Sequence, residues 1–408
     1  MLSKRYKLPI WALPLLIAGL VALLGWWGND RLRATIEDQL KTQLSATLHA
    51  NVTALGIWSV NQTRLATALA DDPDVREPAV AVLRAPPSPR REFRLSPELQ
   101  QFTSALRLQL PQLGYGTAQL VNTNFVVVAN SIRTQFGGNN EVSDAHTNKF
   151  AQLFAMGKPV IITPFRPELL VQRRAARNVS DEALTNIMVR RLNRSAQNMA
   201  NHRRGDATLM QVAAPVRDLD DRIVGALALI IDPEKEFSRI LSVARSGETG
   251  ETYAFDESGL MISRSRFDDQ LRDLGLIDKT NTTSALNLRL RDPGGDMTAG
   301  FKPDDSENYA RPLTRLVGSA VYGEDEVDVN PSRDYRGVPV VGASCWLPQF
   351  GFGVATQIDA DEAYRPLRVL QLVFVVLVLC LLLFATGMFV FSYANLAWQQ
   401  RLSEAELK

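Results

Sequence analysis

Two long apolar segments bracket this chain, and the residues between them mix apolar and polar positions as in a water-soluble fold. The first segment runs from Leu8 to Trp27 and the second from Val369 to Tyr393, and neither contains a charged residue. About 20 apolar residues cross a bilayer core as an α-helix, and one charge at mid-bilayer costs about 3 kcal/mol. The pattern therefore predicts two transmembrane helices that hold the intervening region on one side of a membrane.

The charges that flank these segments predict the orientation. Lys4, Arg5 and Lys7 precede the first segment without an acidic residue, and positive flanks remain cytoplasmic. Arg365 and Arg368 then lie at the outer edge of the second segment, but long loops cross the membrane largely regardless of charge. We expect a two-pass protein of the inner (cytoplasmic) membrane with an extracytoplasmic, periplasmic loop. A cleaved signal peptide is the alternative for the first segment, and its long apolar run disfavours this.

A long amphipathic helix is predicted directly after the first segment. Apolar residues recur at four-residue steps: Leu32, Ile36, Leu40, Leu44, Leu48 and Val52. This stripe either packs on its own domain or also forms a dimer seam. A strict four-residue stripe drifts around a helix of 3.6 residues per turn, so we expect only the part from Leu32 to Leu44 to contact a second protomer in a homodimer. Asp71-Asp72-Pro73 is expected to end the helix.

From Ser96 the pattern changes to a mixture of short helices and strands. Ser96 is a suitable N-cap and Pro97 a suitable first helical residue. Helices are expected over residues 96–110, 144–156, 181–200 and 232–242, with strands over 125–130, 160–165, 207–216 and 223–231. A similar order repeats, with strands at 252–256, 260–263, 338–346 and 352–358 around a loop-rich stretch at 268–319. Short hairpins require antiparallel sheets, so the predicted fold class is α+β, with tandem antiparallel modules on a long N-terminal helix.

Composition excludes several function classes. The net charge of +1 gives no electrostatic case for nucleic acid. The chain has three histidines, and none has a second ligand at metal spacing. No nucleophile elbow, zinc-protease motif or phosphate-binding loop occurs. We therefore expect no catalytic residues, no metal and no cofactor, and no enzyme within these residues.

Several motifs resemble double Cache sensors, the extracytoplasmic ligand-binding regions of many bacterial receptors. The similar segments are 247–256, 259–267, 334–343, 346–348 and 352–356 in the second module, and 213–218 and 223–227 in the first. The resemblance covers roughly residues 30–365 and implies tandem PAS-like Cache modules. Segment 247–256 is also similar to Cache regions attached to serine/threonine kinases and nucleotide cyclases.

The resemblance gives a domain organisation. The expected parts are a cytoplasmic tip and first transmembrane helix (1–28), a long helix and linker (29–95), a membrane-distal Cache module (96–242), a membrane-proximal Cache module (243–364), a second transmembrane helix (365–393) and a cytoplasmic signalling helix (394–408). The family implies a ligand pocket in the distal module. Its amino-acid-binding branch uses a Tyr, an Arg and a Trp near the first strands, whereas this chain has only Arg133 at matching spacing, which disfavours an amino-acid ligand.

Five residues of the distal module are candidates for ligand binding. Arg133 and Arg166 could hold a carboxylate through bidentate hydrogen bonds. Phe150 and Phe165 could wall the site, and Gln211 could orient the ligand. The alternatives are that the phenylalanines belong to the core and the arginines to the solvated surface. In the second module, we expect Arg264, Arg266, Asp334 and Arg336 to form a structural ion-pair cluster.

Together these observations predict a transmembrane sensor. It would bind a small polar or anionic metabolite and pass a conformational change through the second membrane helix to a cytoplasmic output, a serine/threonine kinase or cyclase, because a ligand shifts an equilibrium by its differential affinity for two states. The alternative is a membrane-anchored scaffold or assembly protein without a small-molecule ligand. A pocket with convergent polar groups favours the sensor, whereas a filled module favours the scaffold.

Overall fold

The computed structural model describes residues 12–85, 96–131, 144–166, 208–278, 283–303 and 311–406. The chain divides into two compact units. One unit combines residues 1–43 with residues 359–408, and we call it the helical unit. The other comprises residues 44–358, and we call it the α+β unit.

A single helix, α1 (Ala12–Asp71), runs through 60 residues and confirms the predicted long helix. It ends at the expected break, where the Asp72 side chain accepts a hydrogen bond from the Asp74 amide and caps α2 (Pro73–Arg84). In the α+β unit its buried positions are Leu44, Leu48, Asn51, Leu55, Ser59, Gln62, Ala66, Leu69 and Ala70. From Leu44 to Leu69 they are three or four residues apart, close to the helical repeat of about 3.6, so the buried stripe stays on one face and includes polar residues.

The first sheet of the α+β unit has five antiparallel strands in the order β2-β1-β5-β4-β3. The strands are β1 (Thr117–Asn122), β2 (Val127–Asn130), β3 (Val160–Phe165), β4 (Leu209–Arg217) and β5 (Ile223–Ile231). Helix α5 (Asp144–Met156) packs on one face, with α2 on the other; α4 (Pro97–Gln112) packs beside α2 and β1.

The second sheet has four strands in the order β6-β9-β8-β7. Its elements are α8 (Phe237–Val243), β6 (Glu251–Phe255), α9 (Asp268–Asp273), α10 (Arg315–Val321), β7 (Glu326–Arg333), β8 (Pro339–Leu347) and β9 (Phe352–Asp359). A buried aromatic core that includes Tyr253, Phe255 and Tyr335 supports this sheet. The predicted α+β fold with antiparallel sheets and a long N-terminal helix is therefore confirmed.

Several predicted elements differ in the structure. Two strands, β1 and β7, were not predicted, and α9 and most of α10 lie within the stretch that was expected to be loop-rich. The strand expected at 260–263 makes only isolated bridges, at Leu260 and Met261. The helix expected from residue 232 begins at Phe237, after a turn stabilised by the Asp232 side chain. The helix expected at 181–200 lies outside the described residues.

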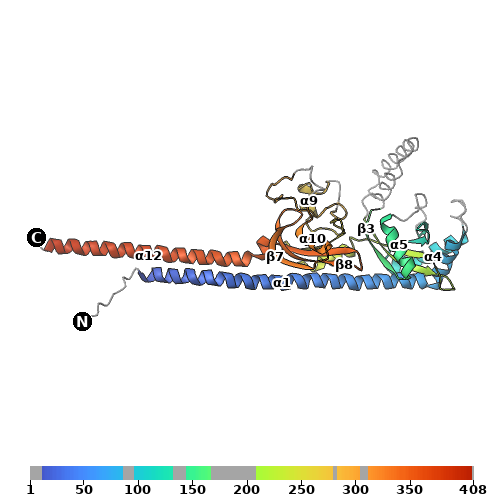
Figure 1. Ribbon diagram of the computed structural model, residues 1–408, viewed down its shortest axis with the longest axis horizontal. Helices are drawn as coiled ribbons and strands as arrows, with labels where there is room; N and C mark the ends of the chain where they lie inside the picture. The colour runs from blue at the N-terminus through green and yellow to red at the C-terminus, as the bar shows by residue number, and fades with distance from the viewer. Residues whose placement is uncertain are drawn as a thin grey trace. The chain divides into compact units, whose positions relative to one another are not determined.

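The helical unit contains α11 (Ala360–Ala363) and α12 (Arg365–Glu406). Within the described residues, one helix is long and apolar enough to cross a membrane: residues Arg365–Asn395, with a mean hydropathy of 3.0. The first expected span, from Leu8, begins outside the described residues. Helices α1 and α12 run antiparallel, since Gln371 Nε2 donates to Asn29 Oδ1 at 2.7 Å and the Phe374 ring packs against Gly25 (Figure 1).

Candidate functional site

One end of the five-stranded sheet contains three of the five predicted ligand-binding residues: Phe165, Arg166 and Gln211. The register pairs Thr117 with Ile230 and Met210 with Ile231, so β1 and β4 begin where β5 ends. The ends of β2 and β3 lie at the same place, because Asn130 pairs with Gln119 and Phe165 with Leu209. We call this place the site end of the sheet.

Three amide side chains share the α5-facing side of the sheet near the site end. Directly paired antiparallel residues point to the same face, which places Asn130 beside Gln119. Gln211 Nε2 donates to Gln119 Oε1 at 3.2 Å across β5, although 92 residues separate the two in the chain. Asn130 and Gln211 are buried, whereas Gln119 is half-buried. We call Asn130, Gln119 and Gln211 the amide row.

The middle of this face is apolar and consists of small side chains. Ala213, Ala226 and Ala228 lie under Phe150 of α5, which is fully buried. Phe165 is only partly buried and packs against the same cluster. Phe150 is therefore a core residue that also limits the space above the amide row, and Phe165 lies at the site end beside it.

Two buried donors at the site end have no hydrogen-bond partner within the described residues. They are the Nε of Arg166 and the Oγ1 of Thr208. Arg166 follows Phe165 and Thr208 precedes Leu209, so in this antiparallel pair the two residues lie next to each other, just beyond the ends of β3 and β4. The Nη2 of Arg166 donates to the Ala285 carbonyl at 3.3 Å, which connects the site end to the second module. A buried unpaired donor costs roughly 1–3 kcal/mol, and an incoming acceptor would recover this.

The five predicted residues are only partly brought together. Phe165, Arg166 and Gln211 meet at the site end, and Phe150 lies over the sheet centre. Arg133 lies outside the described residues. Sequence reasoning missed Gln119, since β1 was not predicted, and it did not single out Asn130, although the strand that contains it was predicted. The alternation of buried Ala118 and Leu120 with Gln119 was the available signal.

A second contact joins α5 to the second module. Lys149 Nζ donates to the Phe350 carbonyl at 3.3 Å. Burial lowers the pKa of Lys149, because a partly desolvated ammonium favours its neutral form. Lys149 and Arg166 of the first module thus each donate a hydrogen bond to a backbone carbonyl of the second module.

The second module contains a buried polar network instead of an open site in its described part. The Tyr335 hydroxyl and the Ser265 hydroxyl both donate to the Glu251 carboxylate. Tyr253 donates to the Gln357 side-chain oxygen at 3.0 Å. Burial, with the nearby Glu251 charge, raises the pKa of Tyr335 well above its usual value. Each polar side chain named in this network therefore has a hydrogen-bond partner.

The predicted ion-pair cluster is correct for only two of its four members. Arg336 Nε binds Asp334 Oδ2 at 2.7 Å, and both side chains are nearly inaccessible. Arg264 instead pairs with Asp268 at 2.9 Å, and Arg266 donates to the Gly250 carbonyl. Burial raises the pKa of Asp334 to about 6 despite its arginine partner. The four residues do not form one ion-pair cluster, because Arg264 and Arg336 each pair with an acidic residue close to them in the sequence, whereas Arg266 donates to a backbone carbonyl.

Comparisons with known proteins found no matching family model and no matching curated protein. Among solved structures, the ligand-binding domain of the Pseudomonas fluorescens chemoreceptor CtaA in complex with L-leucine is 10% identical, with a TM-score of 0.40 over 82% of this chain and 99% of that chain. The periplasmic domain of RsbU from Chlamydia trachomatis is 14% identical, with a TM-score of 0.40 over 83% and 99%. The sensor domain of the V. cholerae histidine kinase DctB is 10% identical, with a TM-score of 0.42 over 81% and 98%. The identities of these three structures are at most 14% and their TM-scores at most 0.42, so the similarity by itself assigns no function to this chain.

Proposed function

We propose that this chain is a membrane-anchored sensor that binds a small extracytoplasmic ligand at the site end of the five-stranded sheet. The observation that carries the proposal is a pair of buried donors beside the amide row, Arg166 Nε and Thr208 Oγ1, which have no hydrogen-bond partner among the residues that the structure describes. Pockets for small molecules combine apolar walls with a few placed polar groups. Phe165 and the alanines beneath Phe150 supply the apolar part.

The ligand is a small polar, anionic metabolite. Arginine binds carboxylates through charge-assisted hydrogen bonds. In Arg166, Nη2 donates to the Ala285 carbonyl, whereas Nε has no partner within the described residues and can donate to a ligand. Gln119 and Gln211 each offer an amide that both donates and accepts, which suits hydroxyl or amide groups on the ligand. Arg133 is the second proposed arginine.

A thermal-shift screen of the full chain in nanodiscs tests the site. Binding to the folded state raises the melting temperature by mass action, and we expect a hit among small carboxylates and polyols. Gln211→Leu and Arg166→Gln should each abolish the shift while the unliganded protein still unfolds cooperatively. Gln152→Leu, at an exposed position of α5, is the matched control and should retain the shift. A shift that survives both site substitutions contradicts the proposed location.

The proposed topology is two-pass, with the α+β unit outside the cytoplasm and both ends inside. It is supported by the apolar helix Arg365–Asn395 and by the positive flank at Lys4, Arg5 and Lys7. A reporter that is active only in the cytoplasm should stay silent when fused at residue 300. An active reporter at this position would reverse the orientation.

The proposed output is cytoplasmic, with a serine/threonine kinase or nucleotide cyclase as the class indicated by segment 247–256. A conformational change in the second sheet could pass directly to α12, because β9 is followed in the chain by α11 and then by α12, which extends to Glu406. We propose that no catalysis occurs within these residues. Membranes from cells with the native gene should show ligand-dependent phosphorylation or cyclic-nucleotide formation, and membranes from a deletion strain should not. Equal activity in both would exclude these outputs.

We also place a homodimer contact on the membrane-near part of α1. Leu32 is 38% exposed, whereas Leu40 and Leu44 are buried within the single chain. The contact is therefore narrower than the expected range from Leu32 to Leu44. Single cysteines at positions 32 and 36, without the native cysteines, should crosslink, and cysteines at 44 and 48 should not.

A further inference from the structure

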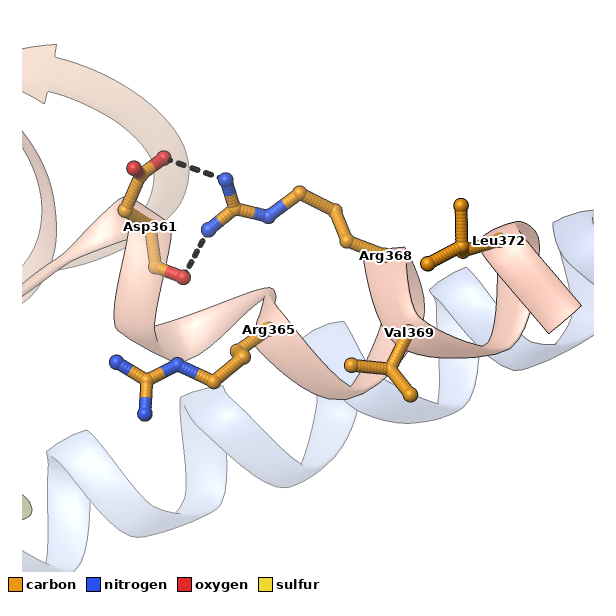
Figure 2. Close-up of a pocket in the computed structure, with 5 residues that line it drawn as sticks. All are labelled: Asp361, Arg365, Arg368, Val369 and Leu372. Carbon is orange, nitrogen blue, oxygen red and sulfur yellow. Dashed lines mark hydrogen bonds and ion pairs between the residues drawn. The ribbon is translucent and has the colours of Figure 1, made fainter.

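A shallow groove of about 390 Å³ lies on the first turns of the apolar helix α12. It is lined by Asp361, Arg365, Arg368, Val369 and Leu372 (Figure 2). Residues four apart lie above one another on a helix. Arg365 with Val369, and Arg368 with Leu372, therefore form two adjacent rows, each with an arginine on the outer side and an aliphatic residue one turn further into the apolar segment.

The groove carries more positive than negative charge. Its lining contains two arginines and one carboxylate, that of Asp361, which pairs with Arg368 and is solvated: the Asp361 side chain is 90% exposed. Arg368 Nη1 binds Asp361 Oδ1 at 3.0 Å, and its Nη2 donates to the Asp361 carbonyl (Figure 2). An exposed pair of this kind contributes little, typically 0–1 kcal/mol, so a phosphate could replace the carboxylate on Arg368.

The groove lies at the depth where the apolar run begins. Most residues from Val369 onward are apolar, and many of them are exposed, including Leu372 at 64%. On the antiparallel helix α1, the hydrogen bond from Gln371 to Asn29 places Arg31 at the same level. Arg31 lies over the Trp27 ring at 5.8 Å. A tryptophan with an arginine at the end of an apolar segment is typical of the headgroup region of a bilayer.

We propose that this groove binds the phosphate of an anionic phospholipid, with the acyl chain against Val369 and Leu372. The proposal rests on the proposed membrane span of α12. Guanidinium groups match phosphate oxygens in bidentate geometry, and the aliphatic row faces the hydrocarbon. It also accounts for Arg365 and Arg368 at the outer edge of the membrane segment, where orientation rules do not call for positive charge.

The test uses the full chain in nanodiscs that contain equal amounts of phosphatidylglycerol and phosphatidylcholine. Lipid retained after transfer to detergent is measured by native mass spectrometry. We expect wild-type protein to retain phosphatidylglycerol preferentially. R365Q/R368Q should lower that preference about fivefold for each arginine removed, hence about 25-fold, whereas D361N should raise it. R365K/R368K should keep part of the preference, because the charge remains while the bidentate geometry is lost.

The matched control is R222Q/K235Q, which removes two exposed cations that also have acidic neighbours, Asp220 and Asp232. Equal retention by R365Q/R368Q and this control would overturn the proposal. So would an equal loss in R365K/R368K, since the effect would then be one of packing. Displacement of phosphatidylglycerol by an equimolar amount of inorganic phosphate would indicate a soluble anion instead of a lipid. Extraction of wild-type protein from membranes by alkaline carbonate would overturn the membrane span itself, separately from the groove.

Discussion

Replacement of Arg336 by methionine tests the buried ion pair of the second module. Methionine keeps much of the aliphatic volume that packs over the Phe267 ring, which lies 3.8 Å from the guanidinium. The change leaves Asp334, 1% exposed, without its cation. Removal of one partner from a buried pair typically costs about 3–5 kcal/mol, and we expect this loss of unfolding free energy at pH 8.

The loss should depend on pH in a defined direction. The pKa of Asp334 is about 6 in the folded protein, above its usual 3.8. The folded state therefore binds this proton more tightly than the unfolded chain, and the ionised carboxyl destabilises the fold above pH 6, by on the order of 3 kcal/mol. This destabilisation is relieved as the pH falls from 6 towards 3.8. Without Arg336 the pKa rises further, so the penalty of the substitution should shrink between pH 8 and pH 5 to about 1–3 kcal/mol.

Amide hydrogen exchange of the full chain measures the effect locally, on peptides from β6 and β8. Arg333→Met is the matched control, because Arg333 binds Asp292 at 2.8 Å in a pair that solvent reaches, with 48% and 22% exposure. Its expected cost is about 0–1 kcal/mol. The reasoning is refuted if Arg336→Met costs no more than this control at pH 8, or if its cost is the same at pH 5.

Two further substitutions test the packing of α1 and one tight turn. Glu236→Ala should destabilise the α+β unit by roughly 1–3 kcal/mol, since its carboxylate accepts hydrogen bonds from Trp58 at 2.9 Å and from Gln62 at 3.1 Å; chemical unfolding monitored by tryptophan fluorescence measures this, and an unchanged midpoint contradicts it. Gly337→Ala should cost more than about 1 kcal/mol, because φ is +80° and a Cβ would lie 1.8 Å from the Gly295 carbonyl oxygen; thermal unfolding checks this, and Gly275→Ala, with φ +73° but no neighbour within 4 Å, separates the clash from the backbone strain.

Local patterns in the sequence were sufficient to predict the helices and strands in which buried positions recur at a regular spacing. The apolar period predicted α1 and its end at Asp71-Asp72-Pro73, because helix periodicity and capping depend on neighbouring residues. The β4–β5 hairpin was predicted for the same reason, since its strands are continuous apolar runs around a polar turn. By contrast, β7 is a polar edge strand that contains Pro331, a composition that the apolar-run rule does not detect.

The candidate site was only partly predictable. Gln211 was identified as a pocket residue, but its partner Gln119 is 92 residues away and lies beside it only through the shared neighbour β5. The same holds for the polar members of the α1 stripe: Asn51 is buried because it meets Thr252 at 3.3 Å, and Gln62 because it meets Glu236. An apolar pattern assigns such residues to the surface.

The sequence by itself determined the apolar segments, the long helix and the antiparallel character of both sheets, because each depends on spacing along a few turns or on the length of a hairpin. The tertiary structure decided which polar groups are buried together, including the amide row and the Asp334–Arg336 pair. The physical reason is that a buried polar side chain is stable only with a partner, and that partner is chosen by strand order and register across long sequence distances.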